Sequence, residues 1–133
     1  MTNEIETQLP SFNSTPSLAR AFLRSALATW NLDGFGEITE LLTDELVSNV
    51  VRHVGEPMTL RVLCHGERLR VEVDDPSKVR PRLLYPDTQS TTGRGLLLVD
   101  GLATDWGTEV RSDGKTVWFE IDVATATREV HGE

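Results

Sequence analysis

The chain has 133 residues, of which 38% are hydrophobic and 26% charged, a composition typical of one folded domain. Its 21 acidic and 13 basic residues give a formal net charge of -8, which opposes non-specific binding to nucleic acid. A single cysteine, Cys64, cannot form an internal disulfide. Neither a signal-peptide pattern nor an apolar run of roughly 18 residues is present. We therefore expect a cytoplasmic domain with no nucleic-acid or membrane partner.

A polar start and two helical patterns occupy the first half of the chain. Residues 1–12 are polar and fit either a loose arm or an edge strand. Residues 14–30 carry apolar side chains at helical spacing, and Thr15 is the predicted N-cap of this helix. A second helix is predicted over residues 37–54 and ends where Gly55 interrupts the pattern.

The second half is predicted to contain two β-hairpins separated by a long loop and a short helix. Apolar side chains alternate with a period of two in residues 58–76 and again in residues 103–123, which predicts the hairpins. Residues 77–95 lack periodicity and are predicted to form a loop, whose length is typical of functional or mobile loops. Residues 94–103 read as a short apolar helix, and residues 124–133 as a polar tail.

Helices in one part of the chain and hairpins in the rest, without regular alternation, predict the α+β class. We expect a two-layer α/β sandwich in which helices cover one face of a mixed, mostly antiparallel sheet. Residues 1–133 are expected to form a single domain with a core over about residues 15–123, a flexible N-terminal arm and a flexible C-terminal tail.

The second predicted helix carries three polar residues at four-residue intervals, namely Glu45, Asn49 and His53. Residues four apart differ by about 40° around a helix axis, so Glu45 and Asn49 lie side by side on or beside the apolar stripe. Either they point to the solvated edge of the helix, or they face a ligand. His53 also suits the negative end of the helix dipole, which gives it a structural explanation.

Two further stretches favour a ligand site. In "VEVDDPS", Asp74 and Asp75 end a predicted strand, where a carboxylate can accept a hydrogen bond from an exocyclic amino group or simply form a solvated turn. In "TTGRGLLLV", Gly93 and Gly95 precede a helix, and bare N–H groups at a helix start attract phosphate. The glycine pattern matches neither a dinucleotide-binding fingerprint nor a P-loop.

Four stretches, "ELVSNVVRH", "VEVDDPS", "GRGLLLV" and "GKTVWFEI", occur in this order in the chain. They resemble the N, G1 and G2 boxes and the final strand of the ATPase superfamily shared by gyrase, heat-shock chaperones, MutL-type repair proteins and histidine kinases. The fold implied is the Bergerat-type histidine kinase-like ATPase fold. Within the superfamily, "GRGLLLVDGLATDWG" is similar to the bacterial anti-sigma factor serine kinases. The resemblance covers about residues 18–123.

The resemblance implies roles for the residues at matching positions. Glu45 matches the N-box glutamate, the general base of the family, and Asn49 matches the asparagine that supplies an oxygen to Mg²⁺. Asp75, rather than Asp74, matches the G1 aspartate that binds the adenine amino group. Thr116 matches the threonine near adenine in the final strand.

The remaining matches concern the phosphates and the turn after G1. The G2 box, which lies beside the phosphates in the family, corresponds to Gly93, Arg94, Gly95 and Leu96. Arg94 could reach a phosphate or cap the helix against solvent. Ser77 stands where the family usually has the G1 glycine, and threonines precede the G2 box where kinases often carry a basic residue.

These matches imply an ATP-binding, Mg²⁺-dependent serine kinase that phosphorylates an anti-anti-sigma antagonist and regulates transcription by partner switching. The implied partners are ATP, the antagonist protein and a sigma factor, and relatives suggest a homodimer. The alternative is a catalytically weak or inactive ATPase-like module that sequesters a sigma factor or antagonist, as the substitutions near the G2 box suggest. A third reading is slow ATP hydrolysis without a protein substrate.

Overall fold

The computed structural model describes residues 2–79 and 98–124 of the chain. In chain order the elements are β1 (Thr2–Leu9), α1 (Thr15–Thr29), the 3₁₀ helix η1 (Asp33–Phe35), α2 (Gly36–His53), β2 (Met58–His65), β3 (Arg68–Asp75), β4 (Asp105–Arg111) and β5 (Gly114–Asp122). Residues 98–102 are also helical. No helix within the described residues is long and apolar enough to cross a membrane.

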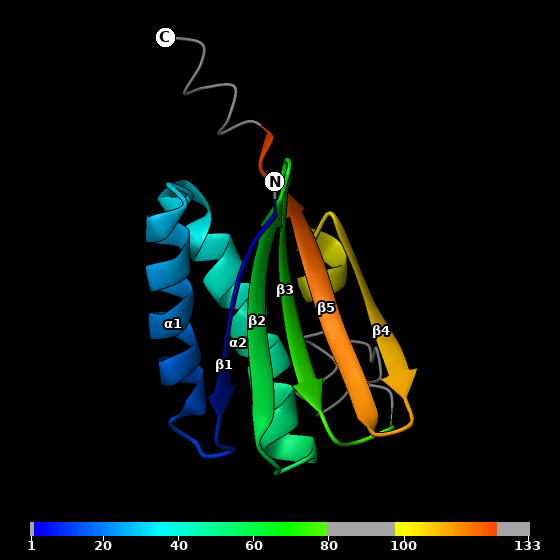
Figure 1. The fold of residues 1–133 in the computed structure, drawn as a ribbon. Helices are drawn as coiled ribbons and strands as arrows, with labels where there is room; N and C mark the ends of the chain where they lie inside the picture. The colour runs from blue at the N-terminus through cyan, green and yellow to red at the C-terminus, as the bar shows by residue number, and fades with distance from the viewer. Residues whose placement is uncertain (1, 80–97, 125–133) are drawn as a thin grey trace, which may run out of the picture.

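The elements form two layers (Figure 1). Helices α1 and α2 pack together on one face of a five-stranded sheet, whose strand order is β1-β2-β3-β5-β4. The predicted two-layer α+β sandwich is therefore confirmed. Every strand pair is antiparallel in the part of the chain that the structure describes, so the sheet shows no parallel pair there, in contrast to the expected mixed sheet.

The N-terminal segment forms an edge strand of the sheet. β1 pairs with β2 over its whole length, from Thr2 opposite His65 to Leu9 opposite Met58. The edge-strand interpretation is confirmed. The expectation of a flexible N-terminal arm is wrong, because this segment is held to β2 by continuous strand pairing.

The sheet buries one face against the helices. On the three central strands most of the side chains that face the helices are apolar and buried: Leu60, Val62, Leu69, Val71, Val73, Val117, Phe119 and Ile121. The helices contribute the buried side chains of Leu23, Leu27, Leu42, Leu46 and Val47. The antiparallel pairing of β2 with β3 and of β4 with β5 confirms both predicted hairpins. On the central strands a slip of one residue would turn the apolar set to solvent.

The start of α1 differs from the sequence-based expectation. Ser14 is the N-cap residue and makes no side-chain capping bond, so the prediction of Thr15 as N-cap is wrong. Thr15 is fully buried, and its hydroxyl donates to the Pro10 carbonyl at 2.5 Å and accepts from the Phe12 N–H at 2.9 Å. The hydroxyl therefore ties the loop between β1 and α1 instead of the first helical turn.

Replacing Thr15 by valine is expected to lower the free energy of unfolding by about 1–3 kcal/mol. Valine keeps the volume but leaves the Phe12 N–H and the Pro10 carbonyl without the hydroxyl. Urea denaturation followed by circular dichroism measures the change. The matched control is Thr29→Val, which removes an exposed hydroxyl bonded to the Ser25 carbonyl and should cost less than about 0.5 kcal/mol. Equal losses in the two variants would contradict the role of the buried hydroxyl.

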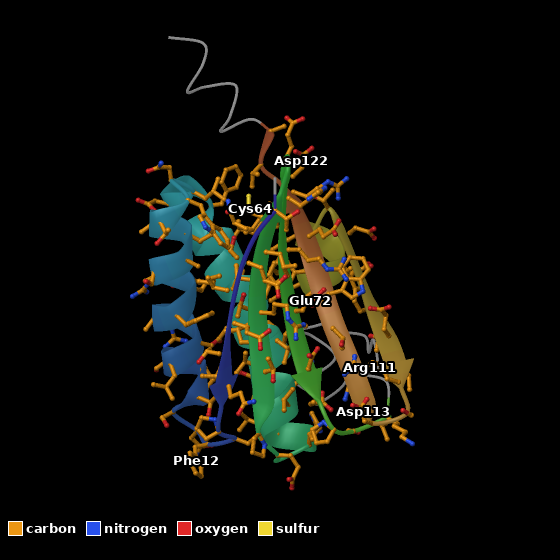
Figure 2. All side chains as sticks on the ribbon, in the orientation of Figure 1. Phe12, Cys64, Glu72, Arg111, Asp113 and Asp122 are labelled. Carbon is orange, nitrogen blue, oxygen red and sulfur yellow. The ribbon has the colours of Figure 1, made fainter. Side chains whose placement is uncertain are left out.

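The sheet face turned away from the helices carries a charged network. Arg61 donates hydrogen bonds to Glu72 at 2.6 Å and to Asp74 at 2.9 Å. Figure 2 shows Glu72 on this open face. Burial lowers the pKa of Arg61, but its hydrogen bonds to carboxylates outweigh this effect and raise the pKa overall. The Arg70 guanidinium lies 4.0 Å from the centre of the Trp118 ring, a cation–π contact. The charges on this face are thus largely paired within the chain.

Candidate functional site

The polar stripe of α2 is partly buried. Asn49 is 9% exposed, and Glu45, one turn before it, is half-buried. The Asn49 Oδ1 atom has no hydrogen-bond partner among the residues that the structure describes. A buried carboxamide oxygen without a partner is costly, so this position indicates a ligand or an ordered water. Asn49 therefore does not lie at a solvated edge, whereas His53 at the end of α2 is exposed.

The two aspartates at the end of β3 point to opposite faces of the sheet. Asp75 is 5% exposed and lies on the helix-facing side of the strand together with Val73. The Ser77 N–H donates to Asp75 Oδ1 at 2.7 Å, which fixes the turn after the strand. Asp74 instead accepts a hydrogen bond from Arg61 on the open face. Of the two carboxylates, Asp75 is the one that faces the helical layer.

A buried lysine lies beside Asp75. Lys115 on β5 is its register partner, so the two side chains lie on the same face of the sheet. The Lys115 Nζ atom lies 3.0 Å from Asp75 Oδ1 and 2.9 Å from Oδ2, and the two side chains are 6% and 0% exposed. Oδ1 accepts a hydrogen bond from Nζ, whereas Oδ2 is in ion-pair contact but accepts no hydrogen bond within the described residues. Each buried charge is therefore paired, as burial requires.

Thr116 lies on the opposite face of the sheet from Asp75. Its hydroxyl donates to Asp74 Oδ1 at 2.6 Å and accepts a hydrogen bond from Arg111. The position of Thr116 near adenine stays a prediction. Because successive side chains of a strand alternate in direction, Thr116 does not lie beside Asp75. Lys115 lies there instead. Asp74 and Arg111 line an open hollow of about 330 Å³ at this end of the sheet.

Comparison with known proteins decides the family. Residues 12–121 match the family described as histidine kinase-like ATPase domain. The chain belongs to this family. An uncharacterized protein of Streptomyces coelicolor is 40% identical to this histidine kinase-like ATPase domain over 82 residues, which represent 57% of the chain and 77% of that protein.

Two solved structures share the fold of this histidine kinase-like ATPase domain. One contains the RsbU and RsbW domains of Rv1364c from Mycobacterium tuberculosis, with a TM-score of 0.70 and 18% identity; the match covers 91% of this chain and 32% of that one. The other is the histidine kinase domain of the Erythrobacter litoralis EL346 blue-light activated histidine kinase, with a TM-score of 0.53 and 18% identity, covering 92% and 69%. The chain thus spans about a third of the mycobacterial protein chain that it matches.

The glycine-rich part of this histidine kinase-like ATPase domain lies outside the described residues. This part holds the predicted phosphate-binding residues, Gly93, Arg94, Gly95 and Leu96. The helix predicted over residues 94–103 is present in its described part, since residues 98–102 are helical and Val99 is fully buried. The described half of the site therefore consists of the α2 stripe and the end of β3 with its β5 neighbour.

The described site residues fit Mg²⁺ bound together with a phosphate ligand. Within residues 2–79 and 98–124, no group of three or more His, Cys, Asp or Glu side chains could hold a metal ion. Asn49 Oδ1 is an oxygen of the kind that Mg²⁺ accepts. Mg²⁺ commonly uses one or two protein groups and completes its coordination shell with phosphate oxygens and water. The Asn49 carboxamide therefore suits a metal that is shared with phosphate, and does not suit a site in which all metal ligands come from the protein.

Proposed function

We propose that this domain binds Mg²⁺-ATP and acts as an anti-sigma factor kinase, transferring phosphate to a serine of a small antagonist protein and so controlling transcription by partner switching. The buried, unpartnered Asn49 Oδ1 atom, one helical turn from Glu45, is the observation that carries the proposal. Membership of the histidine kinase-like ATPase family, which implies ATP binding, supports it. The likeness in fold to a chain with an RsbW domain supports the regulatory part.

The predicted site residues that the structure describes have distinct roles in the proposed reaction. Asn49 would hold Mg²⁺ through Oδ1, and the metal would neutralise charge on the phosphates. Glu45 would orient the substrate serine and accept its proton. Asp75 would accept a hydrogen bond from the adenine amino group, and the Ser77 N–H keeps its carboxylate oriented. Asn49 and Glu45 come from one helix, so their relative position is fixed by helix geometry.

The phosphate contacts in this proposal are assigned to the G2 box. The backbone N–H groups of Gly93, Gly95 and Leu96 would bind phosphate oxygens at a helix start, and Arg94 would add a positive charge. Because the transferred phosphate carries developing negative charge, such donors act by positioning and electrostatic stabilisation.

A second candidate function is a binding module that sequesters its partner without catalysis. Two departures from the family pattern favour it: Ser77 stands in place of the G1 glycine, and threonines stand where kinases often carry a basic residue before the G2 box. In that case the site would keep the shape of an ATPase pocket and lose its chemistry. Phosphate release from Mg²⁺-ATP without a protein substrate would instead indicate simple hydrolysis.

Calorimetric titration of Mg²⁺-ATP tests the proposal at its first step. We expect the wild type to bind, and Asn49→Ala to bind about tenfold to a hundredfold more weakly, because a buried ligand to a charged group is lost. The difference should shrink when EDTA removes Mg²⁺. Asn13→Ala, which changes an exposed asparagine outside the site, is the matched control and should bind like the wild type. Absence of both heat and thermal stabilisation in the wild type would overturn ATP binding.

A further inference from the structure

We infer that Lys115 donates a hydrogen bond to the ring nitrogen N1 of adenine, next to the exocyclic amino group whose hydrogen bond Asp75 accepts. The inference rests on the proposed binding of ATP and adds to it a residue that determines base specificity. It starts from the buried Asp75–Lys115 pair, to which no sequence motif assigned a role.

Lys115 keeps hydrogen-bonding capacity at a buried position. An ammonium group has three N–H donors. Its Nζ atom donates to Asp75 Oδ1 and contacts Oδ2, which leaves at least one N–H for another partner. Because the side chain is only 6% exposed, bulk water has little access to that donor. A buried donor without a partner is costly, so the position indicates a ligand or an ordered water.

The Asp75–Lys115 pair also offers a matching acceptor. Asp75 Oδ2 accepts no hydrogen bond within the described residues, although Nζ lies 2.9 Å away. The pair therefore combines a carboxylate oxygen that accepts no hydrogen bond with an ammonium group that has at least one further N–H donor. The Watson–Crick edge of adenine presents the complementary arrangement, an amino donor next to a ring-nitrogen acceptor, and proteins commonly read bases along that edge. A carboxylate alone would accept a hydrogen bond from the amino group and would leave the ring nitrogen without a donor.

The position of the pair agrees with this role. Asp75 and Lys115 lie on the helix-facing side of β3 and β5, and α2, which carries Glu45 and Asn49, contacts both strands. Thr116, whose side chain points to the open face, cannot take the same place without a slip of the strand. Lys115 thus lies on the side of the sheet that faces α2, the helix that carries the proposed contacts Glu45 and Asn49.

The alternative explanation is that Lys115 only stabilises the fold. In that case the ammonium serves to neutralise Asp75, and its removal would lower stability without changing which part of the base is read. The two readings differ in one quantity, the change in affinity when the ring nitrogen alone is removed from the ligand.

Titration of the wild type with ATP, 1-deaza-ATP and 7-deaza-ATP in the presence of Mg²⁺ tests the inference. Replacing N1 by C–H should weaken binding about tenfold to a hundredfold, since a hydrogen bond to a charged donor is lost. 7-deaza-ATP, which changes the ring away from the amino edge, is the matched control ligand and should bind like ATP. In Lys115→Met, which keeps the length of the side chain, ATP and 1-deaza-ATP should bind equally.

The possible results separate the inference from the proposed function. Equal binding of ATP and 1-deaza-ATP to the wild type overturns the inference and leaves ATP binding intact. An equal loss with both deaza ligands overturns it too, because the effect is then not located at N1. No binding of ATP to the wild type overturns the proposed function and the inference together. The comparison in the wild type can overturn the inference even if Lys115→Met does not fold.

Discussion

Replacing Glu45 by glutamine is expected to slow phosphate transfer by about 10²- to 10⁴-fold while ATP affinity stays within about twofold of the wild type. Glutamine has nearly the same shape, but it cannot accept the proton of the substrate hydroxyl. Glu45 is half-buried and lies one turn from Asn49, so a substitution of equal size should disturb the helix little. Mass spectrometry of phosphoserine on the antagonist and calorimetry with Mg²⁺-ATP measure the two quantities.

The control for this experiment lies on the same helix. Glu37 is an exposed glutamate in the first turn of α2, and Glu37→Gln should leave both transfer and binding unchanged. A Glu45→Gln protein that phosphorylates at the rate of the wild type would show that Glu45 is not the base. If neither the wild type nor Glu45→Gln produces phosphoserine but both still bind the antagonist, the results favour a module that sequesters its partner without catalysis.

Replacing Gly114 by alanine is expected to destabilise the domain by about 3 kcal/mol or more. A β-carbon at this position would lie 2.1 Å from the Asp75 carbonyl oxygen and 2.9 Å from Pro76 Cα. Both atoms belong to the backbone, so no side chain can rotate away to make room. The glycine has φ of 154°, a conformation that other residues rarely adopt. The melting temperature should fall by roughly 10 °C, which thermal unfolding followed by circular dichroism measures.

The same change should also weaken ATP binding, because the clash pushes on the residue that is proposed to bind the base. Gly34→Ala is the matched control, since its added β-carbon has no atom within 4 Å. The control should be stable and should bind like the wild type. A Gly114→Ala protein with the stability of the wild type would mean that the β5 start and the turn after β3 can separate at little cost.

Local periodicity was sufficient to predict most of the elements. The helix predicted over residues 37–54 agrees with α2 to within one residue at each end. The hairpins in residues 58–76 and 103–123 were also predicted, because burying one face of a strand produces a period of two. Thr15 was assigned to a cap because the pattern shows a helix start but not the loop carbonyl that its hydroxyl binds.

The site was harder to predict, because it depends on which strands are neighbours. Asp75 was selected by its motif, and the structure places it on the helix-facing side. Thr116 and Lys115 are adjacent in sequence, so a motif cannot tell which of them faces Asp75 without the register between β3 and β5. An acidic and a basic residue opposite each other on paired strands is the signal that would have identified Lys115. That signal appears only after the pairing is known.

The pairing of β3 with β5 also sets the order in which the domain can assemble. The strands of each hairpin are joined by short turns and can meet quickly, whereas β3 meets β5 only when the chain closes over residues 76–113. Loop closure costs entropy before the contacts that it permits are made, and such non-local pairings slow folding. Asp75 and Lys115 come from the two sides of that closure. A folding intermediate in which the two hairpins had formed but β3 and β5 had not yet paired would already have most of the local structure. It would still lack the Asp75–Lys115 pair that is proposed to bind the base.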